Sequence, residues 1–249
     1  MKKTEIQVQT KLVAPKENNN SRRKFLKMGS LVVVGSGFLL SCSSDDDLMM
    51  NPMPPGDVFD LGSGDLGILN YAYALEQLEA AFYTNVLNGS YWMNATPEEK
   101  LILEDLYKHE VIHREFFKAA ITGAVGSDTS KVLPELEFDF SSVDFSSRNS
   151  VLRTANILED TGVAAYNGAG SLLETPGYLV LAGKIVSVEA RHAAAIRSLF
   201  LEDPKAFAGD DVIDANGLDL AKSPSEILTA VGQTGFVKTE FTANQLPTG

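Results

Sequence analysis

Four long segments of this chain carry apolar residues at the three-and-four spacing of an amphipathic helix, and each apolar stripe contains an acidic residue near its middle. The segments cover residues 65–88, 96–123, 146–173 and 175–202. The polar residues within the stripes are Glu76, Glu110 with His113, Glu159, and Glu189 with His192. The pattern therefore predicts an all-α, four-helix fold that buries six ionisable side chains at one level of its core.

Burying these six side chains together is costly unless something neutralises them. Each desolvated carboxylate loses several kcal/mol of hydration, and four of them at one level also repel each other. Two divalent cations would balance the four negative charges, and the histidines would add neutral nitrogen ligands. A spacing of three places the Glu and His of each Glu-x-x-His pair on one helix face. One Glu from each of two helices plus Glu-x-x-His from each of the other two matches the ligand set of di-iron and di-manganese bundles.

The same plan occurs twice along the chain, which strengthens this interpretation. Tyr83 follows Glu76 by seven residues, and Tyr166 follows Glu159 by the same number. Each of these two helices precedes a helix that carries a Glu-x-x-His pair. We expect the two tyrosines to pack in the core with a polar tip, and a role beside the metals, as hydrogen-bond donors or as radical shields, is the alternative.

Three segments resemble the ferritin-like superfamily, and more narrowly the bacterial ferritin-like domain family often found behind twin-arginine leaders. They are residues 75–83, 164–169 and 188–193. The resemblance implies a ferritin-like four-helix bundle over residues 65–201, with a long crossover at 124–145 between its second and third helices. It also implies that all six stripe residues bind two metal ions, with Glu110 and Glu189 as bridging carboxylates.

Two residues beside the stripes have competing interpretations. Glu79 lies one turn from Glu76 and is a candidate alternate or outer ligand, although Gly162 occupies the matching place in the third helix. His109 precedes Glu110 but points off the stripe, so we expect it to be a surface or groove residue rather than a ligand. For the six ligands as a set, the alternative is a bundle that no longer binds metal and keeps a polar core network.

Two arginines also lie next to the predicted ligands. Arg114 follows His113, and Arg191 precedes His192. We expect both guanidinium groups to be solvated, and orientation of a ligating carboxylate is the alternative.

The first 41 residues resemble a twin-arginine lipoprotein signal peptide. A basic segment at 21–27 precedes an apolar run at 28–40, which as a helix would span about 20 Å, less than the roughly 30 Å of a bilayer core. Residues 39–42 resemble a lipobox, so Cys42, the only cysteine, is the predicted lipidation site. Residues 42–64, which include three prolines and several glycines, are expected to form a flexible tether. The acidic run at 43–47 resembles a surface-export tag, which favours an outer-membrane or cell-surface lipoprotein.

The net charge of the chain limits the classes of molecule that it can bind directly. The chain has a formal net charge of −12, and beyond residue 41 its net charge is −18. Such an acidic surface excludes nucleic acid and anionic lipid as direct ligands, so contact with a membrane is expected through the lipid anchor alone. Residues 202–249 form a C-terminal extension with weak patterns, in which 223–231 is expected to form one short helix.

The predicted centre favours an oxidoreductase with two iron or manganese ions, because Glu and His ligands suit both metals. Dioxygen, peroxide and ferrous iron are the expected substrates. With a single cysteine, the chain has no rubredoxin-type iron site of its own. A metal-binding or interaction lipoprotein without turnover is the alternative, and a structural surface protein that uses the fold as a scaffold is a third interpretation.

Overall fold

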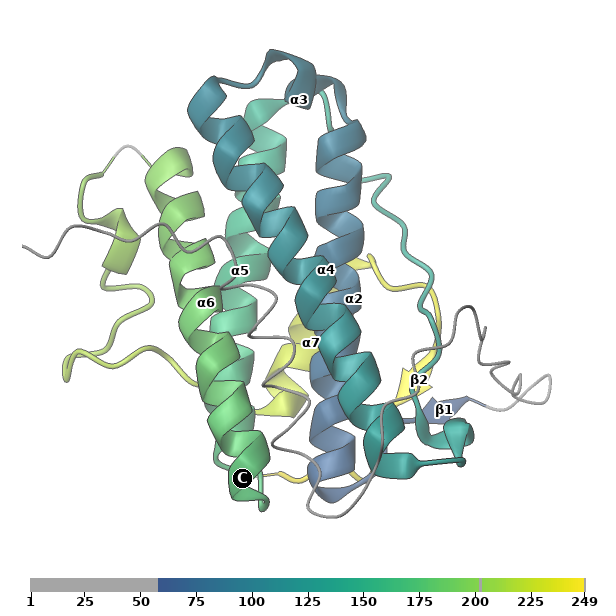
Figure 1. Ribbon diagram of the computed structural model, residues 1–249. Helices are drawn as coiled ribbons and strands as arrows, with labels where there is room; N and C mark the ends of the chain where they lie inside the picture. Colours follow the sequence, from purple (N-terminus) through teal and green to yellow (C-terminus); the bar gives the residue numbers. More distant parts are fainter. Residues whose placement is uncertain (1–57, 202, 249) are drawn as a thin grey trace, which may run out of the picture. The chain divides into compact units, whose positions relative to one another are not determined.

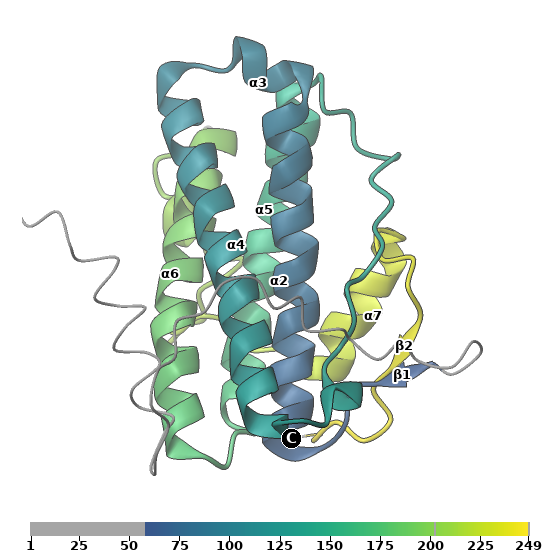
Figure 2. The same ribbon diagram turned by 45° about the vertical axis from the view of Figure 1, so that its right-hand side comes forward.

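The computed structural model describes residues 58–201 and 203–248, and its main body is a bundle of four long helices (Figure 1). They are α2 (Gly64–Asn88), α4 (Pro97–Val125), α5 (Arg148–Gly170) and α6 (Pro176–Phe200). Helix α2 packs antiparallel to α4, and α5 packs antiparallel to α6 (Figures 1 and 2). The predicted all-α four-helix bundle is confirmed, with helix ends within three residues of those expected.

Side-chain capping sets the starts of α4 and α5, whereas α2 and α6 begin without it. Thr96 accepts a hydrogen bond from the backbone N–H of Glu99, whose carboxylate accepts one from the N–H of Thr96 in return, so α4 begins with a capping box. Helix α6 begins without such a cap, because the side chain of Thr175 accepts no hydrogen bond from the first turn. Asp65 of α2 instead accepts hydrogen bonds from the backbone N–H groups of Glu174 and Thr175, which ties the start of α6 to the start of α2.

The long connection between α4 and α5 runs back along the bundle, from the end at which α4 finishes to the end near the short helix α3 (Ser90–Asn94) (Figure 2). It includes the 3-10 turn η1 (Thr129–Lys131). Two buried amide side chains of α2 hold it in place. Asn70 bonds the backbone of Lys131 and Leu133, and Gln77 bonds that of Pro134 and Leu136. These polar residues on α2 therefore satisfy the connection's backbone.

The folded part of the chain begins earlier than the sequence suggested. We expected residues 42–64 to be a flexible tether, but strand β1 (Phe59–Asp60) pairs in parallel with strand β2 (Phe241–Thr242), and Leu61 is fully buried. The pairing partner lies near the other end of the chain, so the local sequence could not reveal it. The predicted leader at 1–41, Cys42 and most of the tether lie outside the described residues.

The C-terminal extension wraps around the bundle rather than hanging free. Its helix α7 (Pro224–Thr234) corresponds to the short helix that the sequence predicted at 223–231, and it packs against α5 (Figure 2). The N–H of Lys222 donates to the carbonyl of Ala164, and a Cβ at Gly168 would lie 1.8 Å from the carbonyl oxygen of Lys222, so only glycine permits this approach. A second contact involves the turn η2 (Ala206–Ala208), whose Ala206 carbonyl accepts a hydrogen bond from buried Arg197 of α6. Among the described residues, no helix combines the length and hydropathy needed to cross a membrane.

Candidate metal centre

All six predicted ligands lie together inside the bundle, on four different helices. The four glutamate side chains have no solvent exposure, and the two histidines are also buried. Their ligand atoms form two groups, and within each group these atoms all lie within 4.8 Å of one another. Atoms that bind one ion at about 2.1 Å lie at most about 4.2 Å apart, so each group needs only a small contraction to hold an ion.

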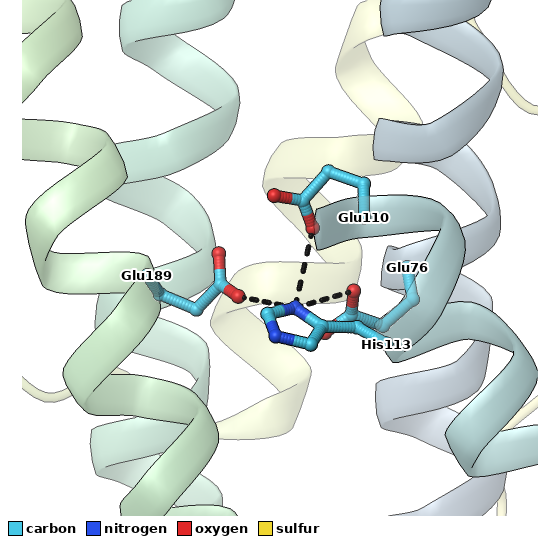
Figure 3. A group of neighbouring side chains, drawn as sticks. All are labelled: Glu76, Glu110, His113 and Glu189. Atoms are coloured by element: carbon cyan, nitrogen blue, oxygen red, sulfur yellow. Dashed lines mark ion pairs between the residues drawn. The ribbon is translucent and has the colours of Figure 1, made fainter. Parts of the chain in front are cut away.

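The first group joins α2, α4 and α6 around His113 (Figure 3). Nδ1 of His113 lies 2.8 Å from Oε1 of Glu189, and 3.5 Å from Oε2 of both Glu76 and Glu110. Figure 3 shows the three carboxylates converging on this nitrogen from three directions. We call this group position 1.

The second group repeats the first with the halves of the bundle exchanged. Nδ1 of His192 lies 2.7 Å from Oε1 of Glu110, 3.5 Å from Oε2 of Glu189 and 3.6 Å from Oε2 of Glu159. We call it position 2. Glu110 and Glu189 belong to both groups, each offering one oxygen to either side. The two positions are therefore adjacent and share two carboxylates, as a bridged pair of ions requires.

The atoms that face the two positions contact only one another, and none has a hydrogen-bond partner outside the two groups in the described part of the chain. They are Oε2 of Glu76, both Oε atoms of Glu110 and Glu189, Oε2 of Glu159, and Nδ1 of His113 and His192. Buried polar atoms are almost always paired, because leaving one unpaired costs about 1–3 kcal/mol. Eight buried polar atoms that converge on two points, with no partner outside the two groups, fit a pair of cations, which would satisfy all of them at once.

The remaining carboxylate oxygens are held by tyrosines from the opposite half. Oη of Tyr83 on α2 donates to Oε1 of Glu159 on α5 at 2.5 Å, and Oη of Tyr166 on α5 donates to Oε1 of Glu76 on α2. Both tyrosines are buried. Glu76 and Glu159, the two carboxylates that belong to a single group each, thus have one oxygen fixed by a tyrosine while the other oxygen faces a metal position. The two tyrosines are therefore hydrogen-bond donors beside the candidate centre.

Comparison with known families agrees with this geometry. A family model described as a ferritin-like domain matches residues 64–202, more than half of the chain. The chain belongs to the ferritin-like domain family. The match begins at the first residue of α2 and ends just beyond α6, so the C-terminal extension lies outside it. A search of curated proteins found none that matches the chain.

The carboxylates of this ferritin-like domain change the protonation of its histidines. Burial opposes a positive charge on His113, but the negative charge of Glu76 and the contacts with Glu110 and Glu189 outweigh burial and raise its pKa well above the usual value. The same balance raises the pKa of His192, through its contacts with the surrounding glutamates. The shift favours the protonated, positively charged form of both imidazoles when no ion is bound, because each ring lies against carboxylates.

The two shared carboxylates titrate as a coupled pair. Burial, followed by the negative charge of Glu189, raises the pKa of Glu110 to about 8. Burial acts on Glu189 as well, but its contacts with His113 and His192 outweigh burial and lower the pKa of this carboxyl to about 2. The pair therefore holds one proton at neutral pH, which limits the repulsion between the carboxylates at the centre of the ferritin-like domain.

Glu79 is buried beside the centre but belongs to neither group. A Cβ at Gly162 would lie 3.1 Å from its Oε1, so the two matching positions face each other across the bundle. A glutamate at each would collide, which explains why one of them is glycine. Burial, and then the negative charges of Glu110 and Glu159, raises the pKa of Glu79 well above its usual value. Its role as an alternate ligand stays a prediction.

His109 contributes an interaction that the sequence did not reveal. It is half-buried, and its Nδ1 lies 2.9 Å from Nε2 of His192, the ring nitrogen that faces away from the metal position. It belongs to neither ligand group. The sequence signal that could have indicated this contact is the place of His109 directly before Glu110, at the edge of the apolar stripe of α4.

The two arginines keep away from the ligating carboxylates. Arg114 pairs with the exposed Glu115, and Arg191 donates to the backbone carbonyl of Ser187. The expected solvated state describes both better than an orienting role, because these partners lie on their own helices and outside the two groups.

Proposed function

We propose that this protein is a dinuclear oxidoreductase with two iron or manganese ions, which acts on dioxygen, peroxide or ferrous iron at the cell envelope. The observation that carries the proposal is the sharing of Glu110 and Glu189 between two adjacent buried groups of Glu and His ligands. Two redox-active ions held so close together would exchange two electrons with a small oxidant.

The charges and donor types of the site support a pair of divalent cations. Four carboxylates balance the four positive charges of two such ions, and each position has a single imidazole nitrogen. Carboxylate and imidazole ligands suit iron and manganese, whereas a site built for zinc or copper selectivity would favour softer donors. Oxygen-rich ligands from rigid helices also fix the geometry before an ion binds.

The protein's own residues would bind, orient and shield the ions. Tyr83 and Tyr166 hold the terminal carboxylates in the rotamers that face the metal positions. The apolar core around them, including Phe117 and Leu106, excludes bulk water. A low-dielectric surrounding strengthens every charge interaction inside the site, which favours redox chemistry over exchange of the ions with solvent.

The proposal also places the protein outside the cytoplasm. The twin-arginine motif at 21–27 supports export of the folded protein, and Cys42 supports attachment of a lipid. Folding before export would let the ions be chosen in the cytoplasm. Labelling growing cells with a radioactive fatty acid tests the anchor, because the wild-type protein should be labelled and Cys42→Ala should not.

Turnover is the decisive test of the proposed activity. Apo-protein is reconstituted with ferrous iron or with manganese, and consumption of dioxygen or peroxide is followed against the number of protein chains. Consumption of many equivalents per chain supports an oxidoreductase. A burst that stops near one equivalent per pair of ions supports a metal-binding lipoprotein without turnover.

The control is Glu110→Ala prepared and loaded in parallel. Activity that persists in this variant would come from free or adventitious metal and would contradict the proposal. Wild-type protein that retains no ions after reconstitution would overturn the assignment of the site itself.

A further inference from the structure

The two metal positions differ in what lies behind their histidines. His192 uses both ring nitrogens: Nδ1 faces position 2, and Nε2 lies 2.9 Å from Nδ1 of His109. The two rings are nearly parallel, with 5.1 Å between centroids and 10° between planes. In the described part of the chain, no hydrogen bond is found to Nε2 of His113, the matching atom of position 1. The environments behind the two ligands are therefore unequal.

The direction of the hydrogen bond follows from metal binding. A histidine nitrogen that binds a metal carries no proton, so the neutral ring of His192 must carry its proton on Nε2. Nε2 then donates to Nδ1 of His109, which accepts with its lone pair. This interaction fixes the tautomer and the rotation of the His192 ring, and it makes Nδ1 of His192 a better electron donor.

The unequal environments of the two histidine ligands arise from one pair of residues that occupy corresponding positions in the two halves. His109 directly precedes Glu110 in the first Glu-x-x-His pair, whereas Val188 directly precedes Glu189 in the second. The side chain of valine has no hydrogen-bond acceptor, so the exchange of halves that relates the ligand contacts of the two positions does not extend to this residue pair. The asymmetry is thus a feature of this chain's side chains and not of the helix arrangement.

We propose that His109 is a positioning residue that makes position 2 the tighter of the two metal positions, so that the two ions load in order. The inference rests on the proposed dinuclear site and adds an order of occupation to it. Position 2, with His192 oriented in advance, fills first. Position 1, where His113 must be oriented on binding, fills second.

Binding of Mn²⁺ to the apo-protein, followed by electron paramagnetic resonance of the free ion, measures both steps. The wild-type protein should show two steps, with the tighter one at least about tenfold stronger, since outer hydrogen-bond partners of metal-bound histidines contribute about 10–100-fold to affinity. In His109→Leu, which removes the acceptor at similar volume, the tighter step should weaken by that factor and the weaker step should stay unchanged. His109→Asn, whose amide oxygen replaces Nδ1 as acceptor, should restore the tighter step.

A matched control and an independent measurement keep the test decisive. Val188→Leu changes the corresponding residue of the other half and should leave both steps unchanged. Anomalous scattering from crystals of the wild-type protein grown with one equivalent of Mn²⁺ should show the ion at position 2, and this requires no variant.

The outcomes separate this inference from the proposed function. Two ions of equal affinity in the wild-type protein, a first ion at position 1, or equal weakening of both steps in His109→Leu would each overturn the ordering while the dinuclear site remains. Failure of the wild-type protein to bind Mn²⁺ would overturn both.

Discussion

The first half of the bundle, α2 with α4, and the second half, α5 with α6, carry the same set of ligands but differ in the layer around them. Exchanging the halves turns each contact of position 1 into one of position 2, and it turns the Tyr83–Glu159 bond into the Tyr166–Glu76 bond. The exchange fails at Glu79 with Gly162 and at His109 with Val188. Charge balance requires both halves to supply the same ligands, whereas the surrounding layer is free to differ.

The two failures have different physical origins. Glu79 and Gly162 face each other, so steric exclusion allows a long side chain at only one of them. His109 contacts His192, whereas the side chain of Val188 cannot make the matching hydrogen bond to His113. The difference between Glu79 and Gly162 therefore follows from the way the two halves face each other. The difference between His109 and Val188 has no such steric origin and is specific to this sequence.

The largest expected effect concerns the carboxylates that both positions share. Glu110→Ala removes a shared ligand supplied by the first half, and Glu189→Ala removes one supplied by the second. Each should reduce bound metal from about two ions per chain to near zero, measured by elemental analysis, because both positions lose a ligand. Glu115→Ala, at an exposed position of α4, is the control and should retain both ions. Retention of two ions in either shared-ligand variant would show that the two halves do not form one site.

A second large effect is the pH dependence of metal binding. Each half of the bundle contributes one histidine to the centre, and both histidines must lose a proton to bind an ion. The raised pKa values of His113 and His192 mean that both rings are protonated in the metal-free protein at neutral pH, and each must lose its proton to bind an ion. Metal binding should therefore release about three protons, one from each ring and one from the pair formed by Glu110 and Glu189, and affinity for the two ions should fall by about 1,000-fold for each unit by which the pH is lowered. Calorimetric titrations in buffers of different ionisation enthalpy measure the number released. Release of no protons would contradict the protonation state assigned to both halves.

The tyrosine bonds provide a direct comparison of the halves. Tyr83→Phe frees the outer oxygen of Glu159, and Tyr166→Phe frees that of Glu76, so each should lower the affinity of the adjacent position by about 10–100-fold. Each should also reduce the free energy of unfolding by about 1–3 kcal/mol, because a buried acceptor loses its donor. Tyr71→Phe is the matched control, since the hydroxyl of Tyr71 is buried on α2 without a partner in the described part of the chain. Its removal should leave stability unchanged or raised, and an equal loss in all three variants would point to packing instead.

The smallest expected effect concerns Glu79 and Gly162, which face each other across the bundle. Gly162→Ala gains about 1 kcal/mol of helix propensity, but the new Cβ lies 3.1 Å from Oε1 of Glu79 and forces that carboxyl to move. The substitution should therefore be close to neutral in the wild-type protein and stabilising by about 1 kcal/mol in a Glu79→Ala background. Thermal unfolding of the four proteins measures the coupling. Additive effects would show that the two residues do not restrict each other.

The sequence alone sufficed for most of the fold and for the composition of the candidate centre. Three-and-four spacing predicts the four helices, and the ionisable residues within the apolar stripes identify Glu76 and the other five candidate ligands. Both signals are local, because a helix repeats every 3.6 residues and a carboxylate in an apolar stripe is costly without a partner. The start of α6 is less local, because Asp65 from a distant helix accepts hydrogen bonds from the backbone of the two residues that precede α6.

What the sequence determined by itself is which side chains enter the core and which charges must be neutralised there, because helix periodicity and desolvation act on every residue without knowledge of its distant neighbours. The tertiary structure decided which atoms meet. The pairing of β1 with β2, the crossed tyrosine bonds, the meeting of Glu79 with Gly162, and the contact of His109 with His192 all join different elements of the chain. Such contacts depend on how the helices are rotated and offset against each other, and packing of the whole core sets those quantities.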